Sequence, residues 1–164
     1  MKKSNRKGFT LVELVVVIAI IGILAAILVP TMMNYVKKSK LKSANSNAKL
    51  VYTTVNNQAA DMVVNGTNIT TSDSVTSPAS IIGWSGESGL KKAVYDALKD
   101  NGEGAGYCVY GIDAKGNVTY AQWGDSATPS MLGQYPNPCK DADKAVNKSF
   151  ATSPYSNQAN GDWT

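Results

Sequence analysis

Histidine is absent from the 164-residue sequence. Histidine is the side chain that most often transfers protons near neutral pH, and it is the commonest metal ligand in proteins, so its absence argues against both kinds of site. Two pairs of carboxylates, Asp96 with Asp100 and Asp141 with Asp143, are typical of solvated faces and turns. The glycines of 102–106 lack the Lys-Ser/Thr that completes a phosphate-binding loop. The sequence therefore predicts no enzyme, no catalytic residue, no metal site and no cofactor.

Positive charge is in excess only at the N-terminus. The chain has 16 Lys and Arg against 12 Asp and Glu. The four additional cations are those of the first seven residues, namely Lys2, Lys3, Arg6 and Lys7. The remaining side chains sum to zero, so the basic character of the chain does not indicate nucleic-acid binding. A later cluster of lysines between Lys37 and Lys49 is interpreted as the membrane-interface end of a helix and not as a DNA-binding track.

A long apolar run follows this basic start. It extends from Phe9 to Val29 and contains a single charged residue, Glu13. About 21 residues form a helix roughly 31 Å long, which matches a bilayer core of about 30 Å and exceeds the apolar region of a cleaved secretory signal. The run is therefore predicted to remain in the protein as a membrane anchor. Lysines follow it as well as precede it, so the positive-inside rule gives only weak information on orientation.

Glu13 is the most informative residue of the chain. A carboxylate at the centre of a bilayer costs roughly 2.5–3.5 kcal/mol, and less toward an interface, and such residues usually have a function and a partner. One interpretation is a single-span anchored protein in which Glu13 has no role. The other is that Glu13 pairs with a specific positive group, and the residues before it favour this second interpretation.

The segment Lys7-Gly8-Phe9-Thr10-Leu11-Val12-Glu13, followed by the apolar run, resembles the prepilin signature of type IV pilins and type II secretion pseudopilins. The resemblance is dense from Lys7 to about Lys42 and architectural beyond. It implies that a prepilin peptidase cuts between Gly8 and Phe9, removes the leader 1–8, and N-methylates the new Phe9 amine. Gly8 suits this role because a residue without Cβ lets a protease approach the backbone. The resemblance also implies that Glu13 pairs with the Phe9 ammonium of a neighbouring subunit and sets the axial register.

The helical pattern continues beyond the apolar run. Apolar residues recur at steps of three and four, which predicts an amphipathic helix, and Asn65-Gly66 supplies a stop. A helix over 9–65, with 9–29 in the membrane, would be on the order of 85 Å long. Gly22 and Pro30 weaken it by about 1 and 3 kcal/mol relative to alanine. The pilin resemblance implies that this stretch melts when subunits enter the fibre, and the alternative is a static kink in the membrane.

The residues over 66–164 predict a small head, so that the whole chain is of the α+β class. Its predicted elements are an exposed loop over 67–80, a helix over about 87–100, hairpin strands over 107–112 and 118–123, and a third strand near either 131–134 or 149–151. The loop is rich in Ser and Thr, the helix has apolar residues at helical spacing, and the strands alternate around a glycine-containing turn. We expect the antiparallel sheet to pack on the long helix.

Only two cysteines occur, Cys108 and Cys139. An even pair in a domain outside the membrane suggests one disulfide, which would close a loop of about 31 residues and stabilise the fold by roughly 3–4 kcal/mol. Two free buried thiols are the alternative, since a zinc site without histidine or further cysteine is improbable. The pilin resemblance adds that the C-terminal tail often forms a disulfide-closed loop.

The resemblance implies the function of a structural subunit of a type IV pilus. Such a subunit is a single-span precursor in the inner membrane and then part of a filament at the cell surface. Its implied partners are further copies of the chain, the prepilin peptidase, a membrane platform protein and a cytoplasmic assembly ATPase. The alternatives are a pseudopilin of a secretion or DNA-uptake system, a minor pilin acting as an adhesin, and an anchored receptor that does not polymerise.

Overall fold

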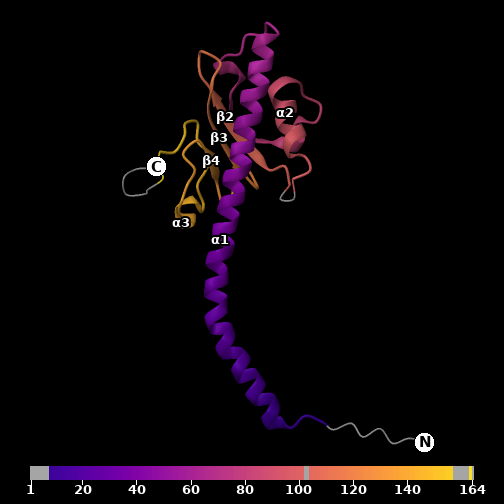
Figure 1. Ribbon diagram of the computed structural model, residues 1–164, viewed down its shortest axis with the longest axis vertical. Helices are drawn as coiled ribbons and strands as arrows, with labels where there is room; N and C mark the ends of the chain where they lie inside the picture. The colour runs from indigo at the N-terminus through magenta and orange to yellow at the C-terminus, as the bar shows by residue number, and fades with distance from the viewer. Residues whose placement is uncertain (1–7, 102–103, 157–162, 164) are drawn as a thin grey trace, which may run out of the picture. The chain divides into compact units, whose positions relative to one another are not determined.

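The computed structural model describes residues 8–101, 104–156 and 163 of the chain. Its packing divides the chain into two compact units, Met1–Val36 and Lys37–Thr164. The described part of the first unit holds the beginning of helix α1, and the second unit holds the remainder of α1 together with all other helices and strands (Figure 1). The antiparallel sheet packed on a long helix confirms the predicted α+β class.

Helix α1 spans Leu11–Val64 as one element, close to the helix predicted over 9–65. Pro30 lies inside it, where the missing N–H interrupts the ladder of backbone hydrogen bonds. The Thr31 hydroxyl donates a hydrogen bond to the Leu28 carbonyl oxygen at 2.8 Å. A side chain therefore supplies a hydrogen bond next to the backbone bond that Pro30 cannot make. The helix continues through the proline.

In the second unit, α1 buries one face. Its buried residues recur at steps of three and four and are Leu41, Ala44, Asn47, Ala48, Val51, Val55 and Ala59. The amphipathic pattern predicted for this part of the helix is therefore confirmed. Asn45 joins the helix to strand β4 and to the segment that follows it, because its side chain accepts a hydrogen bond from the Gln134 N–H (3.2 Å) and donates one to the Cys139 carbonyl oxygen (3.0 Å).

The sheet has four antiparallel strands in the order β1-β2-β3-β4, and the second half of α1 crosses it in Figure 1. The strands are β1 Val75–Ser80, β2 Tyr107–Ile112, β3 Val118–Gly124 and β4 Gly133–Tyr135. The predicted hairpin is confirmed as β2 and β3, with Tyr110 opposite Ala121. The Asp113 carboxylate closes its turn by accepting hydrogen bonds from the N–H groups of Lys115 and Asn117. The third predicted strand corresponds to β4 and not to 149–151.

Strand β1 lies within the segment 67–80 that the sequence predicted to be an exposed loop, and this prediction is wrong. The strand pairs only with β2, at the edge of the sheet, and its register shifts between Val75 and Ala79. An edge strand tolerates proline and polar residues because one of its two sides makes no ladder bonds. Pro78 and the exposed Ser and Thr side chains of β1 are consistent with that position.

The second predicted helix is confirmed as α2, Gly89–Leu98, which is shorter than the predicted 87–100. It buries Leu90, Val94 and Leu98 against the head. Two 3-10 turns, η1 (Thr71–Asp73) and η2 (Ile81–Trp84), flank β1, and a short helix α3, Ala142–Ala145, precedes the tail.

The predicted disulfide between Cys108 and Cys139 is not formed in this structure, in which both thiols are free and buried. Cys108 lies within strand β2 opposite Trp123, whereas the Cys139 thiol donates a hydrogen bond to the Asp141 carbonyl oxygen at 3.1 Å. Burial raises the pKa of both thiols, so they remain protonated. The alternative that the sequence left open, two buried thiols, is the one observed.

Two buried glutamines attach the tail to the sheet instead. Gln122 in β3 and Gln134 in β4 are hydrogen-bonded to each other, Nε2 to Oε1, at 2.9 Å. The Ala151 N–H donates to Gln122 Oε1 (2.9 Å), and the Tyr155 N–H donates to Gln134 Oε1 (2.8 Å). The residues from 151 to 155 are therefore bonded to side chains of the sheet without joining its ladder.

Candidate assembly site

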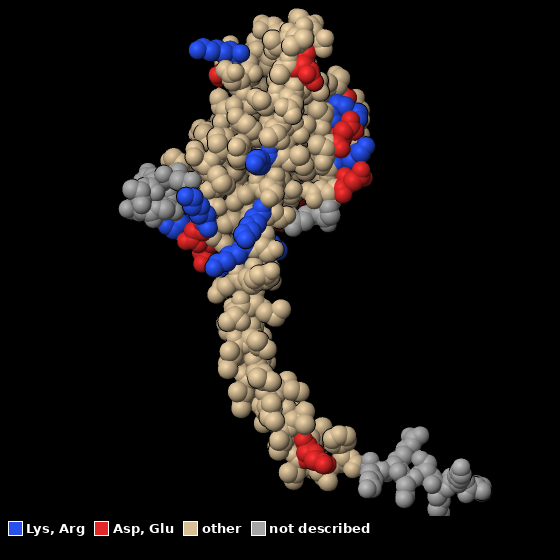
Figure 2. All heavy atoms as spheres, viewed as in Figure 1, with Lys and Arg blue, Asp and Glu red and all other residues tan. Residues whose placement is uncertain are grey.

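The N-terminal part of α1 presents an apolar surface without cover from the rest of its unit. All residues from 8 to 36 are exposed, and Glu13 is the one charged residue among them. Figure 2 shows this as a tan surface with a single acidic patch on the face in view. By length and composition, α1 is the one helix among the described residues that could cross a membrane. A contiguous apolar surface of this size marks a site of contact with lipid or with other proteins.

The Glu13 carboxylate is hydrogen-bonded within its own chain to the residue that precedes the helix. Glu13 Oε2 accepts hydrogen bonds from the Thr10 N–H (2.8 Å) and the Thr10 hydroxyl (2.7 Å). In return, the Glu13 N–H donates to the Thr10 hydroxyl oxygen at 3.2 Å. This reciprocal arrangement is a capping box, which satisfies N–H groups that the first helical turn leaves without partners.

Thr10 is the partner of Glu13 that the sequence analysis did not single out. The signal was present, because Thr10-Leu11-Val12-Glu13 matches the pattern S/T-x-x-E that predicts a helix start. In the structure, Thr10 fixes the position of one Glu13 oxygen and leaves Oε1 without a hydrogen bond to any described residue. The carboxylate is therefore oriented and still has an oxygen available to a partner.

Gly8 and Phe9, predicted to flank the cleavage site, lie before α1 in residues without regular secondary structure. Phe9 is 84% exposed, and a Cβ added at Gly8 would meet no atom within 4 Å. The bond between them is therefore accessible to an enzyme. Residues 1–7 of the predicted leader lie outside the described residues.

Gly22 and Pro30, the predicted weak points, both lie in continuous helix. A Cβ added at Gly22 would also meet no atom within 4 Å, so no contact in this structure requires a glycine there. Neither residue contacts Glu13, which lies more than two helical turns earlier in the chain.

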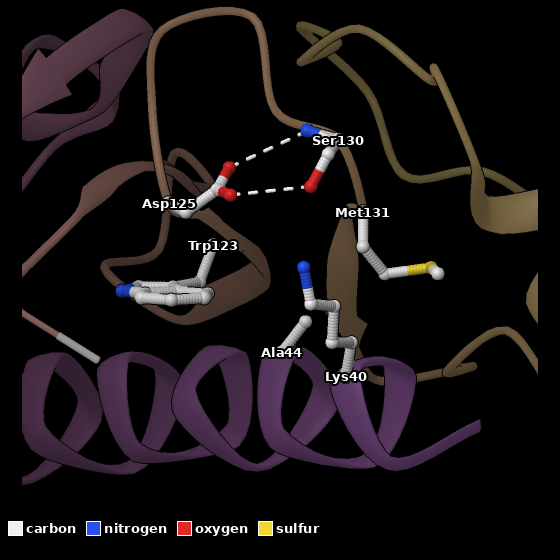
Figure 3. Close-up of a pocket in the computed structure, with 6 residues that line it drawn as sticks. All are labelled: Lys40, Ala44, Trp123, Asp125, Ser130 and Met131. Carbon is white, nitrogen blue, oxygen red and sulfur yellow. Dashed lines mark hydrogen bonds between the residues drawn. The ribbon is translucent and has the colours of Figure 1, made fainter. Parts of the chain in front are cut away.

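The head has a hollow of about 230 Å³ between α1 and the loop after β3, shown in Figure 3. Lys40 extends from α1 toward the space between Trp123 and Met131. The Asp125 carboxylate is engaged with Ser130, accepting hydrogen bonds from its N–H (3.4 Å) and its hydroxyl (3.2 Å). The hollow contains no pair of groups placed for proton transfer, and among the described residues no cluster of His, Cys, Asp or Glu is placed to bind a metal ion.

Comparison with protein-family models identifies the start of the chain. Residues 3–29 match the model described as the prokaryotic N-terminal methylation motif. This range includes Gly8, Phe9, Thr10 and Glu13, and it ends where the apolar run ends. No solved structure matches the chain.

Curated relatives extend the match into the head. The chain is 31% identical over 139 residues to the type IV major fimbrial protein FimA of Dichelobacter nodosus, covering 80% of this chain and 79% of that protein. It is 51% identical over 49 residues to the type IV major pilin protein PilA of Myxococcus xanthus, covering 30% of this chain and 22% of that protein. It is 63% identical over 37 residues to fimbrial protein Q of Moraxella bovis, covering 23% and 24%. With similarity over most of both chains in the first case, the chain belongs to the type IV pilin family.

Proposed function

We propose that this chain is a structural subunit of a type IV pilus. It is made as a single-span membrane precursor, cut between Gly8 and Phe9, N-methylated at Phe9, and polymerised into a surface filament. The observation that carries the proposal is the apolar stretch of 8–36, every residue of which is exposed, with Glu13 as its one charge. Removing such a surface from water stabilises a membrane-bound or assembled state by about 25 cal/mol per Å², and a bilayer and a bundle of identical helices both provide that cover.

Glu13 has the role of directing one subunit to the next. Cleavage before Phe9 creates a new ammonium group one helical turn ahead of the carboxylate. In a filament core that excludes water, a carboxylate without a cation costs several kcal/mol, and pairing removes most of that penalty. Thr10 holds Glu13 Oε2, which leaves Oε1 for the ammonium of a neighbouring subunit. A pair formed in this way has one favourable axial offset and therefore sets the register.

The assembly machinery is the one that the pilin resemblance implies. The sequence has no phosphate-binding loop, and in this family the energy for extracting the helix from the membrane comes from a cytoplasmic ATPase acting through a membrane platform protein. A prepilin peptidase is needed for the cut after Gly8. These three proteins are the partners that the proposal requires.

The substitution Glu13→Val tests the role of the carboxylate. We expect cleavage and membrane insertion to be unchanged, because Val fits the apolar surface, and filaments to be absent because no ion pair orders the subunits. Processing is measured by the mass of the membrane-extracted chain, and assembly by electron microscopy of sheared filaments. Val12→Ala is the matched control, since it changes an exposed apolar neighbour without altering charge. Filaments at the normal yield from Glu13→Val contradict the role.

Immunogold electron microscopy of intact cells distinguishes the pilus from its alternatives, with antibody raised against residues 66–164. Label along the full length of long fibres is the expected result for a main pilus subunit. Label confined to the tips identifies a minor pilin. Label restricted to the envelope, without fibres, favours a pseudopilin or an anchored receptor.

A further inference from the structure

A cavity of about 370 Å³ lies in the second unit, between the first turn of α2, the η1 turn and the end of α1. Met62 of α1, Leu90 of α2 and Tyr110 of β2 form part of its lining, and most of the other lining residues are polar. The volume falls in the range of small-molecule sites. None of its lining residues belongs to the N-terminal stretch described above.

Tyr110 supplies a polar group with no partner among the described residues. The residue is 1% exposed, and its hydroxyl makes no hydrogen bond to any residue that the structure describes. Burial, with smaller effects of Cys108 and Asp73, raises the pKa of this hydroxyl. It is therefore a neutral group able both to donate and to accept a hydrogen bond in the lining of the cavity.

The first turn of α2 adds unused donors. Ser88 is at the N-cap position, yet its side chain makes no capping hydrogen bond. The first N–H groups of a helix have no partners within the helix, and the residues that carry them here, Gly89, Leu90 and Lys91, line the cavity. The Ser88 hydroxyl and these N–H groups are thus available to a ligand.

Asp73 of η1 adds an acceptor. Its Oδ2 accepts a hydrogen bond from the Thr70 N–H at 2.9 Å, while its Oδ1 makes none among the described residues. The remaining charged residues of the cavity, Glu87 and Lys91, form an ion pair with 3.9 Å between Glu87 Oε1 and Lys91 Nζ. Both signs of charge therefore border the cavity, beside neutral hydroxyls.

This combination selects against charged ligands. An anion would be attracted to the start of α2 but repelled by Asp73 and Glu87, and a cation would meet the positive end of the same helix and Lys91. A neutral ligand with several hydroxyl groups satisfies both sides, because each hydroxyl donates to a carboxylate and accepts from an N–H or a phenol. We propose that this cavity binds one ring of a neutral saccharide. The proposal goes beyond filament formation and does not depend on it.

Saturation-transfer difference NMR on the full chain tests the proposal, with dodecylphosphocholine micelles because this detergent contains no sugar. The probes are the methyl glycosides of glucose, galactose, mannose, N-acetylglucosamine and N-acetylgalactosamine. We expect transfer to at least one of them. Tyr110→Phe and Ser88→Ala each remove one uncharged hydrogen bond without removing packing, so each is expected to weaken the affinity about threefold to tenfold.

Tyr107→Phe is the matched control, because Tyr107 lies on the same strand and does not line the cavity. The affinity of the Tyr107→Phe variant for the glycoside is expected to equal that of the chain without substitution. The proposal is overturned if none of the five glycosides receives transfer, or if binding persists unchanged in both Tyr110→Phe and Ser88→Ala. The filament yield of these variants is measured in parallel, so that failure of the saccharide site and failure of the pilus function are separate results.

Discussion

Gln134 has no exposed surface and uses both ends of its side-chain amide. Its Oε1 accepts hydrogen bonds from Gln122 Nε2 (2.9 Å) and the Tyr155 N–H (2.8 Å), and its Nε2 donates to the Tyr155 carbonyl oxygen at 2.7 Å. A buried polar group that loses its partner costs roughly 1–3 kcal/mol. A single side chain therefore couples strand β4, strand β3 and the tail.

Replacing Gln134 with leucine is expected to lower the free energy of unfolding by roughly 2–4 kcal/mol, because the change leaves more than one buried group unpaired. The tail should also become sensitive to proteolysis between residues 149 and 156. Urea unfolding of the full chain in detergent, with limited proteolysis and mass spectrometry, measures both effects.

Gln58→Leu is the matched control for this change. Gln58 lies half-buried on α1 and its side chain makes no hydrogen bond to any described residue, so an effect below about 0.5 kcal/mol is expected, as for substitutions away from special features. Equal stability of the Gln134 and Gln58 variants would falsify the coupling of the tail to the sheet by Gln134.

At the level of single residues, the sequence points to Glu13 more readily than to the contacts within the head. Glu13 could be found because one charge in a long apolar run is conspicuous. The Gln122–Gln134 pair could not be found, since glutamine in a strand has no pattern that shows which residues it will contact. The disulfide predicted from the two cysteines is not formed in this structure, and two positions in a chain carry no information about the distance between their sulfur atoms.

Strand β4 passes close to the backbone of α1 at Gly133. A Cβ built on Gly133 would collide with the Ala44 carbonyl and would lie 2.6 Å from the Asn45 nitrogen. Both neighbours are backbone atoms of a helix, which cannot move without displacing the helix. Glycine is required at this position because the strand passes directly against the backbone of α1.

We expect Gly133→Ala to destabilise the head by at least about 1–3 kcal/mol, the usual cost of overpacking in a core. The thermal unfolding midpoint of the full chain in detergent measures the effect. Gly83→Ala serves as its control, because a Cβ at Gly83 would meet no atom within 4 Å. If the two alanine variants unfold at the same temperature, β4 does not pack on α1 as described.

Elements with a strong local pattern were predicted, and those that depend on partners were not. The repeat of apolar residues along α1 and the alternation in β2 and β3 are properties of the local sequence. Strand β1 lacks such a pattern, because an edge strand containing Pro78 and several exposed polar residues is stabilised chiefly by pairing with β2. Strand β4 is only three residues long, and for the same reason the sequence left it open between 131–134 and 149–151.

At the level of the whole molecule, the buried core and the proposed assembly segment belong to different parts of the chain. Every buried hydrophobic residue of the described core is at Leu41 or later, inside the second unit. Residues 8–36 are all exposed in the isolated chain. The fold of the head is therefore expected not to depend on the segment that we propose drives polymerisation.

A chain that begins at Lys37 tests this separation. It keeps the whole described core and loses the exposed apolar surface, so we expect it to be monomeric without detergent and to unfold cooperatively. Its free energy of unfolding should lie within about 1 kcal/mol of that of the full chain in micelles, since substitutions and cuts outside a core have small effects. Sedimentation velocity and urea unfolding give the two measurements. A truncated chain that aggregates, or that shows no cooperative transition, would mean that residues 8–36 contribute to the head, and the assembly and folding roles could then no longer be assigned to separate units.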